Sequence, residues 1–167
     1  MTSLTFPVLN NADAIFDIIE NTLLTSFSMP LLSSNKNGSI NISGTKLTSL
    51  SFPALTSCRD LSIYSNNDLT SIIFPVLNAV EYFYIGSNKS LTSVGILSLA
   101  TAKNISFGLN ALLSSQVNSI LNKMLSVNPS TGKDIYLSGQ VPPAPPTGQG
   151  ILDKATLINA GNTVTTD

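Results

Sequence analysis

The sequence predicts a parallel β-solenoid, in which short strands of successive coils stack side by side around a common core. Two observations point to this fold class. The triplet Leu-Thr-Ser recurs at a nearly constant spacing, and a short alternating apolar segment that ends in a polar residue precedes each triplet. A single coil of this length cannot bury its own apolar face, so neighbouring coils must stack to form the core. The chain of 167 residues is long enough for one such domain.

The triplets set a period of 22 or 23 residues. They begin at Leu24, Leu47, Leu69 and Leu91, and Met1-Thr2-Ser3 lies in the same frame. Five residues after the start of a triplet, an aromatic residue or Met precedes Pro, as in Met29-Pro30, Phe52-Pro53 and Phe74-Pro75. Proline lacks a backbone donor and disfavours helix in the residue before it. We therefore expect extended chain and little helix within the repeats.

The alternating segments predict one strand per coil and a polar turn after it. They are Phe16-x-Ile18-x-x-Asn21, Leu61-x-Ile63-x-x-Asn66, Phe83-x-Ile85-x-x-Asn88 and Ile105-x-Phe107-x-x-Asn110. Alternation directs the two apolar residues of each strand into the core. The amide that follows can pair backbone groups inside the turn. We expect a structural ladder of buried amides at Asn21, Asn66, Asn88 and Asn110, and a weaker equivalent at Thr45.

These segments resemble the leucine-rich repeat family, whose unit is LxxLxLxxN. Cys58-x-x-Leu61-x-Ile63-x-x-Asn66 and Val80-x-x-Phe83-x-Ile85-x-x-Asn88 match it, and the resemblance covers about residues 1–140. It implies a β-rich leucine-rich repeat solenoid with a parallel sheet on its concave side. Residues 1–113 would then form about five coils of 22–23 residues, and residues 114–167 would form a capping region.

The period breaks after Asn110, because the next matching strand, Ile135-x-Leu137-x-x-Gln140, begins 30 residues after Ile105. Helical spacing of apolar residues predicts a helix in between, with Ser114 or Ser115 as its N-cap; the spaced residues are Val117, Ile120, Leu121, Met124 and Leu125. A Pro-rich extended strap over 141–148 follows. A second helix over about 150–160, which ends at Gly161, and a terminal strand near Val164 complete the predicted cap.

Composition excludes several functions. Only 10% of the residues are charged and the net charge is -1, which gives no basic patch for nucleic acid or an anionic membrane surface. No apolar run is long enough for membrane insertion. The chain has no His and a single Cys58, so transition-metal sites and His-dependent catalysis lack their usual residues. We predict that the protein is not an enzyme and needs no cofactor or metal, since the acidic residues Asp13, Asp17 and Glu20 also match no calcium loop.

All four tyrosines fall at outward positions of the predicted strands, whereas every Phe falls at an inward repeat position. Tyrosine combines an apolar ring with a hydroxyl, which suits stacking on sugars and anchoring of protein interfaces. We predict a ligand-binding face formed by Tyr64, Tyr82, Tyr84, Tyr136, Ser62 and Ser106. On adjacent coils, Tyr64, Tyr82 and Tyr84 should form one contiguous aromatic patch. The alternative is that the tyrosines are there only because they suit strand surfaces.

The C-terminal region, with PPAPPTGQG and DKATLINAGNTVTTD, resembles the end of repeat proteins from Bacteroidetes surfaces and from the tailed phages that infect these bacteria. The resemblance implies a recognition and adhesion module that binds a host-surface protein or glycan. The lack of a signal peptide favours a virion, in a phage tail or spike, over the bacterial cell surface. A structural repeat protein without its own ligand is the alternative. The apolar coil with Leu4 and Phe6 has no cap in the sequence, so we expect other virion or surface subunits to cover it.

Overall fold

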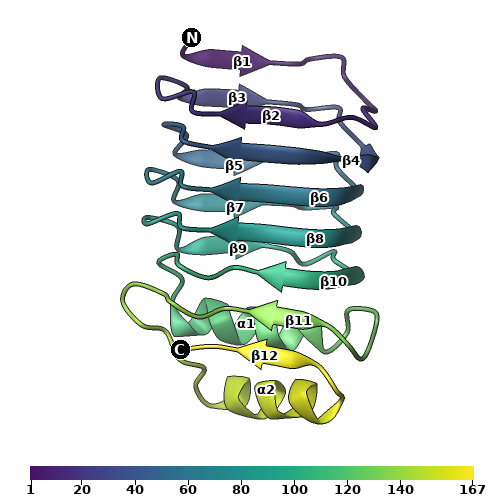
Figure 1. Ribbon diagram of the computed structural model, residues 1–167, viewed down its shortest axis with the longest axis vertical. Coiled ribbons are helices and arrows are strands. Elements are labelled where there is room, and N and C mark those ends of the chain that lie inside the picture. Colours follow the sequence, from purple (N-terminus) through teal and green to yellow (C-terminus); the bar gives the residue numbers. More distant parts are fainter.

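The computed structural model describes residues 1–167 and forms a flattened parallel β-solenoid, with its coils stacked from one end to the other (Figure 1). One wall is a seven-stranded sheet whose spatial order is β2 (Phe16–Ile19), β4 (Ser34–Ser43), β6 (Ser57–Tyr64), β8 (Ala79–Gly86), β10 (Thr101–Ser106), β11 (Asp134–Tyr136) and β12 (Thr163–Thr165). All of its strand pairs are parallel. The predicted β-solenoid is therefore confirmed.

The opposite wall consists of five three-residue strands. A two-stranded sheet contains β1 (Ser3–Thr5) and β3 (Ser26–Ser28), and a three-stranded sheet contains β5 (Ser49–Ser51), β7 (Ser71–Ile73) and β9 (Ser93–Gly95). The first four of these strands precede the Phe-Pro or Met-Pro pairs, and they stay extended as expected because the proline that follows disfavours helix. Strand β9 is extended without a following proline, since Ile96-Leu97 stands in that place.

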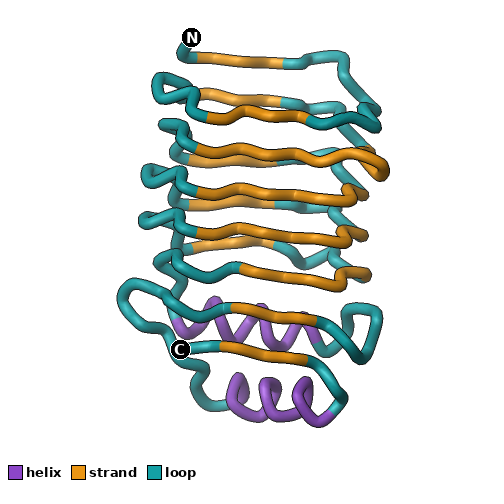
Figure 2. Tube along the Cα trace, viewed as in Figure 1, coloured by secondary structure: helices purple, strands orange, loops and turns teal.

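Two helices take the place of this second wall behind β11 and β12 (Figure 2). They are α1 (Ser114–Met124) and α2 (Gln149–Asn159), close to the predicted ranges. The predicted N-cap is wrong: the N-cap is Leu113, without a side-chain cap hydrogen bond, and Ser114 is the first helical residue. Gly161 has φ +84° after α2, the left-handed conformation expected at a helix end.

A polar side chain joins α1 to the strands it covers. The Gln116 side-chain oxygen accepts a hydrogen bond from the backbone N–H of Val94, 3.2 Å away, in β9, the edge strand of the three-stranded sheet.

At the other end of α1, the buried Lys133 ammonium donates to the carbonyls of Met124, Val127 and Pro129 at 2.7–2.9 Å. Burial lowers the pKa of Lys133 from its ordinary value. The three bonds join the last residue of α1 to the turn that follows it.

The core contains a continuous column of aromatic rings between the two walls. Phe52 stacks on Phe74 with ring centroids 5.7 Å apart, and Phe74 meets Phe83 edge to face at 5.3 Å. Phe83 in turn meets Phe107 at 4.9 Å. These geometries are the favourable ones for aromatic pairs. The segregation of Phe to the inside therefore has a structural cause, because each ring packs on rings of neighbouring coils.

Buried amides connect the turns after β6, β8 and β10. Asn66, Asn88 and Asn110 are almost completely buried, and each accepts a hydrogen bond from a backbone N–H of the preceding coil at 2.9–3.1 Å. Asn21 differs from the prediction: it is only half-buried, and its side chain makes one bond, to the carbonyl of Ile19. At the equivalent position Thr45 donates its hydroxyl forward to the Asn66 side-chain oxygen at 2.7 Å and makes no bond to the coil of Asn21, so the ladder stops at this coil.

Threonine hydroxyls form a second ladder along the triplets, which the sequence analysis did not anticipate. The hydroxyls of Thr25, Thr70 and Thr92 each donate to the carbonyl of the equivalent residue one coil earlier, at 3.0–3.3 Å. This contact explains why the triplet carries Thr as well as Leu. The equivalent bond from Thr48 is missing, so hydroxyl bonds join some of the neighbouring triplets, and the amide ladder joins the turns after β6, β8 and β10.

Candidate functional site

The outer face of β6, β8, β10 and β11 carries all four tyrosines, and we call it the tyrosine face. The strand register aligns Tyr84 with Ser62 on one side and with Ser106 on the other, and Ser106 with Tyr136. Strand β11 remains in the sheet although its coil contains the inserted helix. Tyr136 therefore reaches the same face as Tyr84, two strands away.

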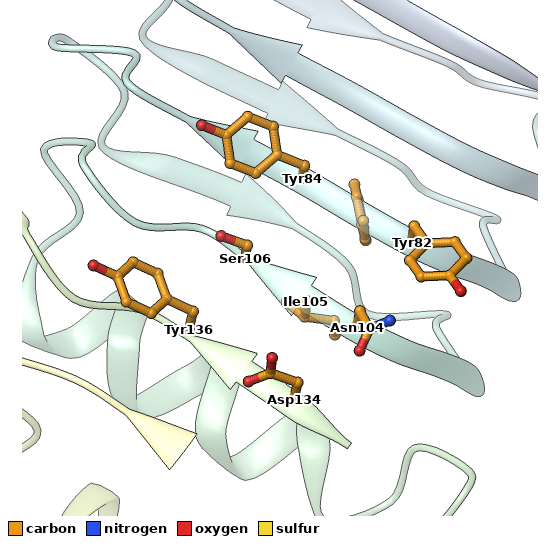
Figure 3. Close-up of a pocket in the computed structure, with 8 residues that line it drawn as sticks. Tyr82, Tyr84, Asn104, Ile105, Ser106, Asp134 and Tyr136 are labelled. Atoms are coloured by element: carbon orange, nitrogen blue, oxygen red, sulfur yellow. The ribbon is translucent and has the colours of Figure 1, made fainter. Parts of the chain in front are cut away.

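A shallow depression of about 340 Å³ lies on the tyrosine face (Figure 3). It forms because the small Ser106 stands between Tyr84 and Tyr136 in one column of side chains. In the next column Asn104 stands between Tyr82 and Asp134. We call this hollow the tyrosine depression; its lining residues are Tyr82, Phe83, Tyr84, Asn104, Ile105, Ser106, Asp134 and Tyr136.

Two buried glycines lie beneath tyrosine rings and fix their position. A Cβ atom added to Gly86 would come within 2.6 Å of the Cζ and Oη atoms of Tyr84. A Cβ added to Gly108 would overlap the ring of Tyr136. Each ring therefore packs one face on a glycine backbone and leaves the rest accessible. The sequence contained a signal for this, because Gly86 and Gly108 fall in the outward column that also holds Tyr64.

The structure brings most, but not all, of the predicted binding residues together. Tyr82, Tyr84, Ser106 and Tyr136 line the depression, whereas Ser62 lies beside Tyr84 outside it. The expected contiguous patch of three rings does not form. Tyr64 contacts Tyr84, with ring centroids 6.0 Å apart and a 49° tilt, but Tyr82 points away from Tyr84 (Figure 3). The depression, rather than direct ring contact, links Tyr82 to the other tyrosines.

Asn104 and Asp134 belong to the depression, although the sequence analysis did not select them. Their alignment with Tyr82 follows from the strand register. Their side chains form no hydrogen bond within the protein, and neither do the hydroxyls of Ser106 and the four tyrosines. By contrast, the side chains of Asn66, Asn88 and Asn110 are engaged in the amide ladder. The polar groups of the depression are therefore free to bind a ligand.

The lining of the tyrosine depression carries one negative charge and no positive charge. Asp134 is the only charged residue in this lining. Two exposed cations, Arg59 of β6 and Lys103 of β10, lie on the same strands outside the depression, and Arg59 pairs with Asp60 at 3.0 Å. An anionic group in the depression would therefore be repelled by Asp134 and meet no lining cation.

Reactive groups are scarce in the rest of the molecule. Cys58 is buried, and burial together with the nearby Asp60 charge raises the pKa of its thiol to about 12, which leaves it unreactive. The chain holds no cluster of three or more His, Cys, Asp or Glu side chains that would suit a metal ion. The tyrosine depression offers ring stacking and hydrogen bonding.

Neither α1 nor α2 is long and apolar enough to cross a membrane. In comparisons with known proteins, no family model, no curated protein and no solved structure matches this chain.

Proposed function

We propose that this protein is a non-catalytic recognition module of the leucine-rich repeat type, which binds its ligand in the tyrosine depression. The observation that carries the proposal is the pair of tyrosine rings held over Gly86 and Gly108 at the border of a hollow with free polar groups. Rings that are fixed before binding lose little conformational entropy when a ligand arrives. Tyrosine is also among the residues that contribute most to binding energy at interfaces.

The proposed setting is a phage virion, where the module would sit in a tail or spike and bind a host-surface protein or glycan. A bacterial cell surface is the alternative location. Support for both comes from the C-terminal segments over 141–167, which resemble the ends of repeat proteins of Bacteroidetes surfaces and their phages. The parallel sheet supports the recognition role, because it presents equivalent side chains of successive coils in straight columns.

The experiment measures attachment of the purified protein to intact cells of Bacteroidetes strains and to immobilised mucin. The test variant is Tyr84→Ala/Tyr136→Ala. The control is Ile73→Ala, which removes a 51% exposed apolar side chain from β7 in the opposite wall. Attachment that depends on the two tyrosines but not on Ile73 supports the proposal. Attachment of the double variant at the level of the unmodified chain would overturn it.

A structural role in a virion or surface array, without a separate ligand, is the second candidate. One observation favours it: β1 and β2 each have only one neighbour in their sheets, and Val8 and Ile15 beside them are 82% and 69% exposed. Unpaired strand edges with nearby apolar side chains are sites where other chains can add. In this role, other virion or surface subunits would cover the coil that contains β1 and β2.

A further inference from the structure

We propose that the tyrosine depression binds an uncharged sugar residue of a glycan and rejects acidic sugars. This inference rests on the recognition function proposed above and names the ligand class of the same site. It follows from three properties of the depression: the arrangement of rings and polar groups, the size of the hollow, and the sign of the charge around it.

Rings and polar groups are placed as a pyranose requires. A sugar ring has an apolar C–H face, which stacks on aromatic rings, and hydroxyls around its edge, which need hydrogen-bond partners. Tyr84 and Tyr136 form the aromatic borders on either side of Ser106, two strand spacings apart, which is about 9.5 Å. Ser106 provides a hydroxyl between these two rings, and Asn104 and Asp134 provide further polar groups in the neighbouring column (Figure 3).

The free polar groups also distinguish a sugar from an apolar protein anchor. Burying Asn104 or Asp134 under an apolar side chain would leave their donors and acceptors unpaired, at a cost in affinity. Hydroxyls can pair with these groups, since the Asn104 amide both donates and accepts and the Asp134 carboxylate accepts. The volume of about 340 Å³ lies at the lower end of small-ligand sites and suits one or two sugar residues rather than a large ligand.

Charge decides between uncharged and acidic sugars. A ligand carboxylate or sulfate in the depression would face Asp134, with Asp60 in the same column and no Lys or Arg in the lining. Outside the lining, Arg59 is already paired with Asp60, and the exposed Lys103 precedes Asn104 on β10. Like charges that lie close together at a protein surface repel each other, so an anionic group beside Asp134 without a cationic partner is disfavoured. The uncharged sugar has no such penalty, and its hydroxyls can donate to Asp134.

The test uses a printed array that pairs uncharged oligosaccharides with their sialylated, sulfated and uronic-acid counterparts. The unmodified protein should bind uncharged members and bind their acidic counterparts at least tenfold more weakly. Asp134→Asn should reduce this discrimination several-fold, because it removes the repelling charge and keeps the shape. Glu81→Gln is the matched control, since Glu81 is an exposed carboxylate of β8 outside the depression, and it should leave the discrimination unchanged.

The outcomes separate this inference from the function on which it rests. Binding to acidic glycans that equals or exceeds binding to their uncharged partners would overturn the inference. A second set of results would also overturn the inference. The protein would bind no glycan on the array, while its attachment to cells depends on Tyr84 and Tyr136, survives periodate oxidation of the surface sugars and is lost after protease treatment. In both cases the recognition function would stand. If attachment to cells does not depend on the two tyrosines, the recognition function itself fails.

Discussion

Asn88 connects three coils with one residue. Its side-chain oxygen accepts from the backbone N–H of Asn66, and its amide group donates to the carbonyl of Ile63, both one coil earlier. Its own backbone N–H donates to the side-chain oxygen of Asn110 in the next coil. All of these groups are buried, so water cannot replace a lost partner.

Replacing Asn88 by Ala should therefore lower the free energy of unfolding by about 1–3 kcal/mol. The loss leaves the N–H of Asn66 and the carbonyl of Ile63 without these partners. Asn21→Ala is the control, because Asn21 is half-buried with one local bond, and its loss should cost less than about 0.5 kcal/mol. Urea titration of both variants measures the difference. Equal midpoints for Asn88→Ala and the unmodified chain would show that the ladder contributes no stability.

Gly86 allows a test of ring position that leaves Tyr84 itself in place. Its φ is not positive, so Ala fits the backbone, and the three atoms nearest to the new methyl group all belong to the outer end of the Tyr84 side chain. Gly86→Ala should displace the ring and weaken ligand attachment, while the free energy of unfolding changes by less than about 1 kcal/mol. Gly95→Ala is the matched control, since a Cβ there makes only ordinary contacts at 3.7 Å or more. If both variants attach equally well, the position of the Tyr84 ring does not matter for binding.

At the scale of elements, the side-chain carboxylate of the C-terminal residue, Asp167, holds the Pro-rich strap over 141–148 against the last coil. Asp167 accepts hydrogen bonds from the backbone N–H groups of Gly139, Gln140 and Ala144 at 2.5–3.2 Å. Burial alone would raise the pKa of Asp167, but these N–H groups and the Ser138 hydroxyl outweigh burial and lower it below its ordinary value of 3.8. The ionised form is therefore favoured by folding.

This shift sets the direction of a pH dependence. A carboxyl whose pKa is lower in the folded state stabilises the fold above its unfolded pKa and loses that contribution as pH falls through the folded value. The melting temperature of the unmodified chain should therefore exceed that of Asp167→Asn at pH 6, and the gap should narrow as the pH falls below about 3.8. A gap that stays constant from pH 6 to pH 2 would contradict the role given to this carboxylate.

Most elements were predictable from sequence because the repeat fixes them. Alternating apolar residues such as Leu61 and Ile63 lie on the same face of a strand, so the strand buries that face. The apolar residues of α1 lie on one face of the helix, which packs against the core. The predicted N-cap was wrong because α1 already begins at Ser114. Leu113 is the N-cap residue, and it makes no side-chain cap hydrogen bond. The role of Lys133 was not predictable, because nothing in the sequence shows that its ammonium lies beneath the end of a helix.

At the scale of the whole molecule, the solenoid places residues in columns that a fixed period predicts. The alignment of Tyr84 with Ser106 and Tyr136 follows from the repeat once the strands are parallel and in register. Ring direction does not follow from the period, and this is why Tyr82 points away and the contiguous patch is missing. The depression depends on the repeat period, which places the small Ser106 between Tyr84 and Tyr136, and on ring direction, which is set by the glycines under these two rings.

Stability should vary along the stack, because each coil contacts only its neighbours. We expect amide hydrogen exchange to be slowest in β6 and β8, which have a paired strand on both sides, and fastest in β1 and β2, which have one. Exchange measured peptide by peptide with mass spectrometry checks this order for the isolated chain. Protection of β1 and β2 equal to that of β6 in the isolated chain would contradict this order.

The most direct test of the recognition claim is the dissociation constant for attachment of Tyr84→Ala/Tyr136→Ala, compared with that of Ile73→Ala at a temperature where both are folded. Loss of central aromatic anchors typically costs more than about 1–2 kcal/mol of binding, which is roughly tenfold or more in affinity. The account predicts at least this weakening for the double variant, with a melting temperature close to that of the control. Equal affinity of the two variants would contradict it and would leave the tyrosines as no more than suitable residues for a strand surface.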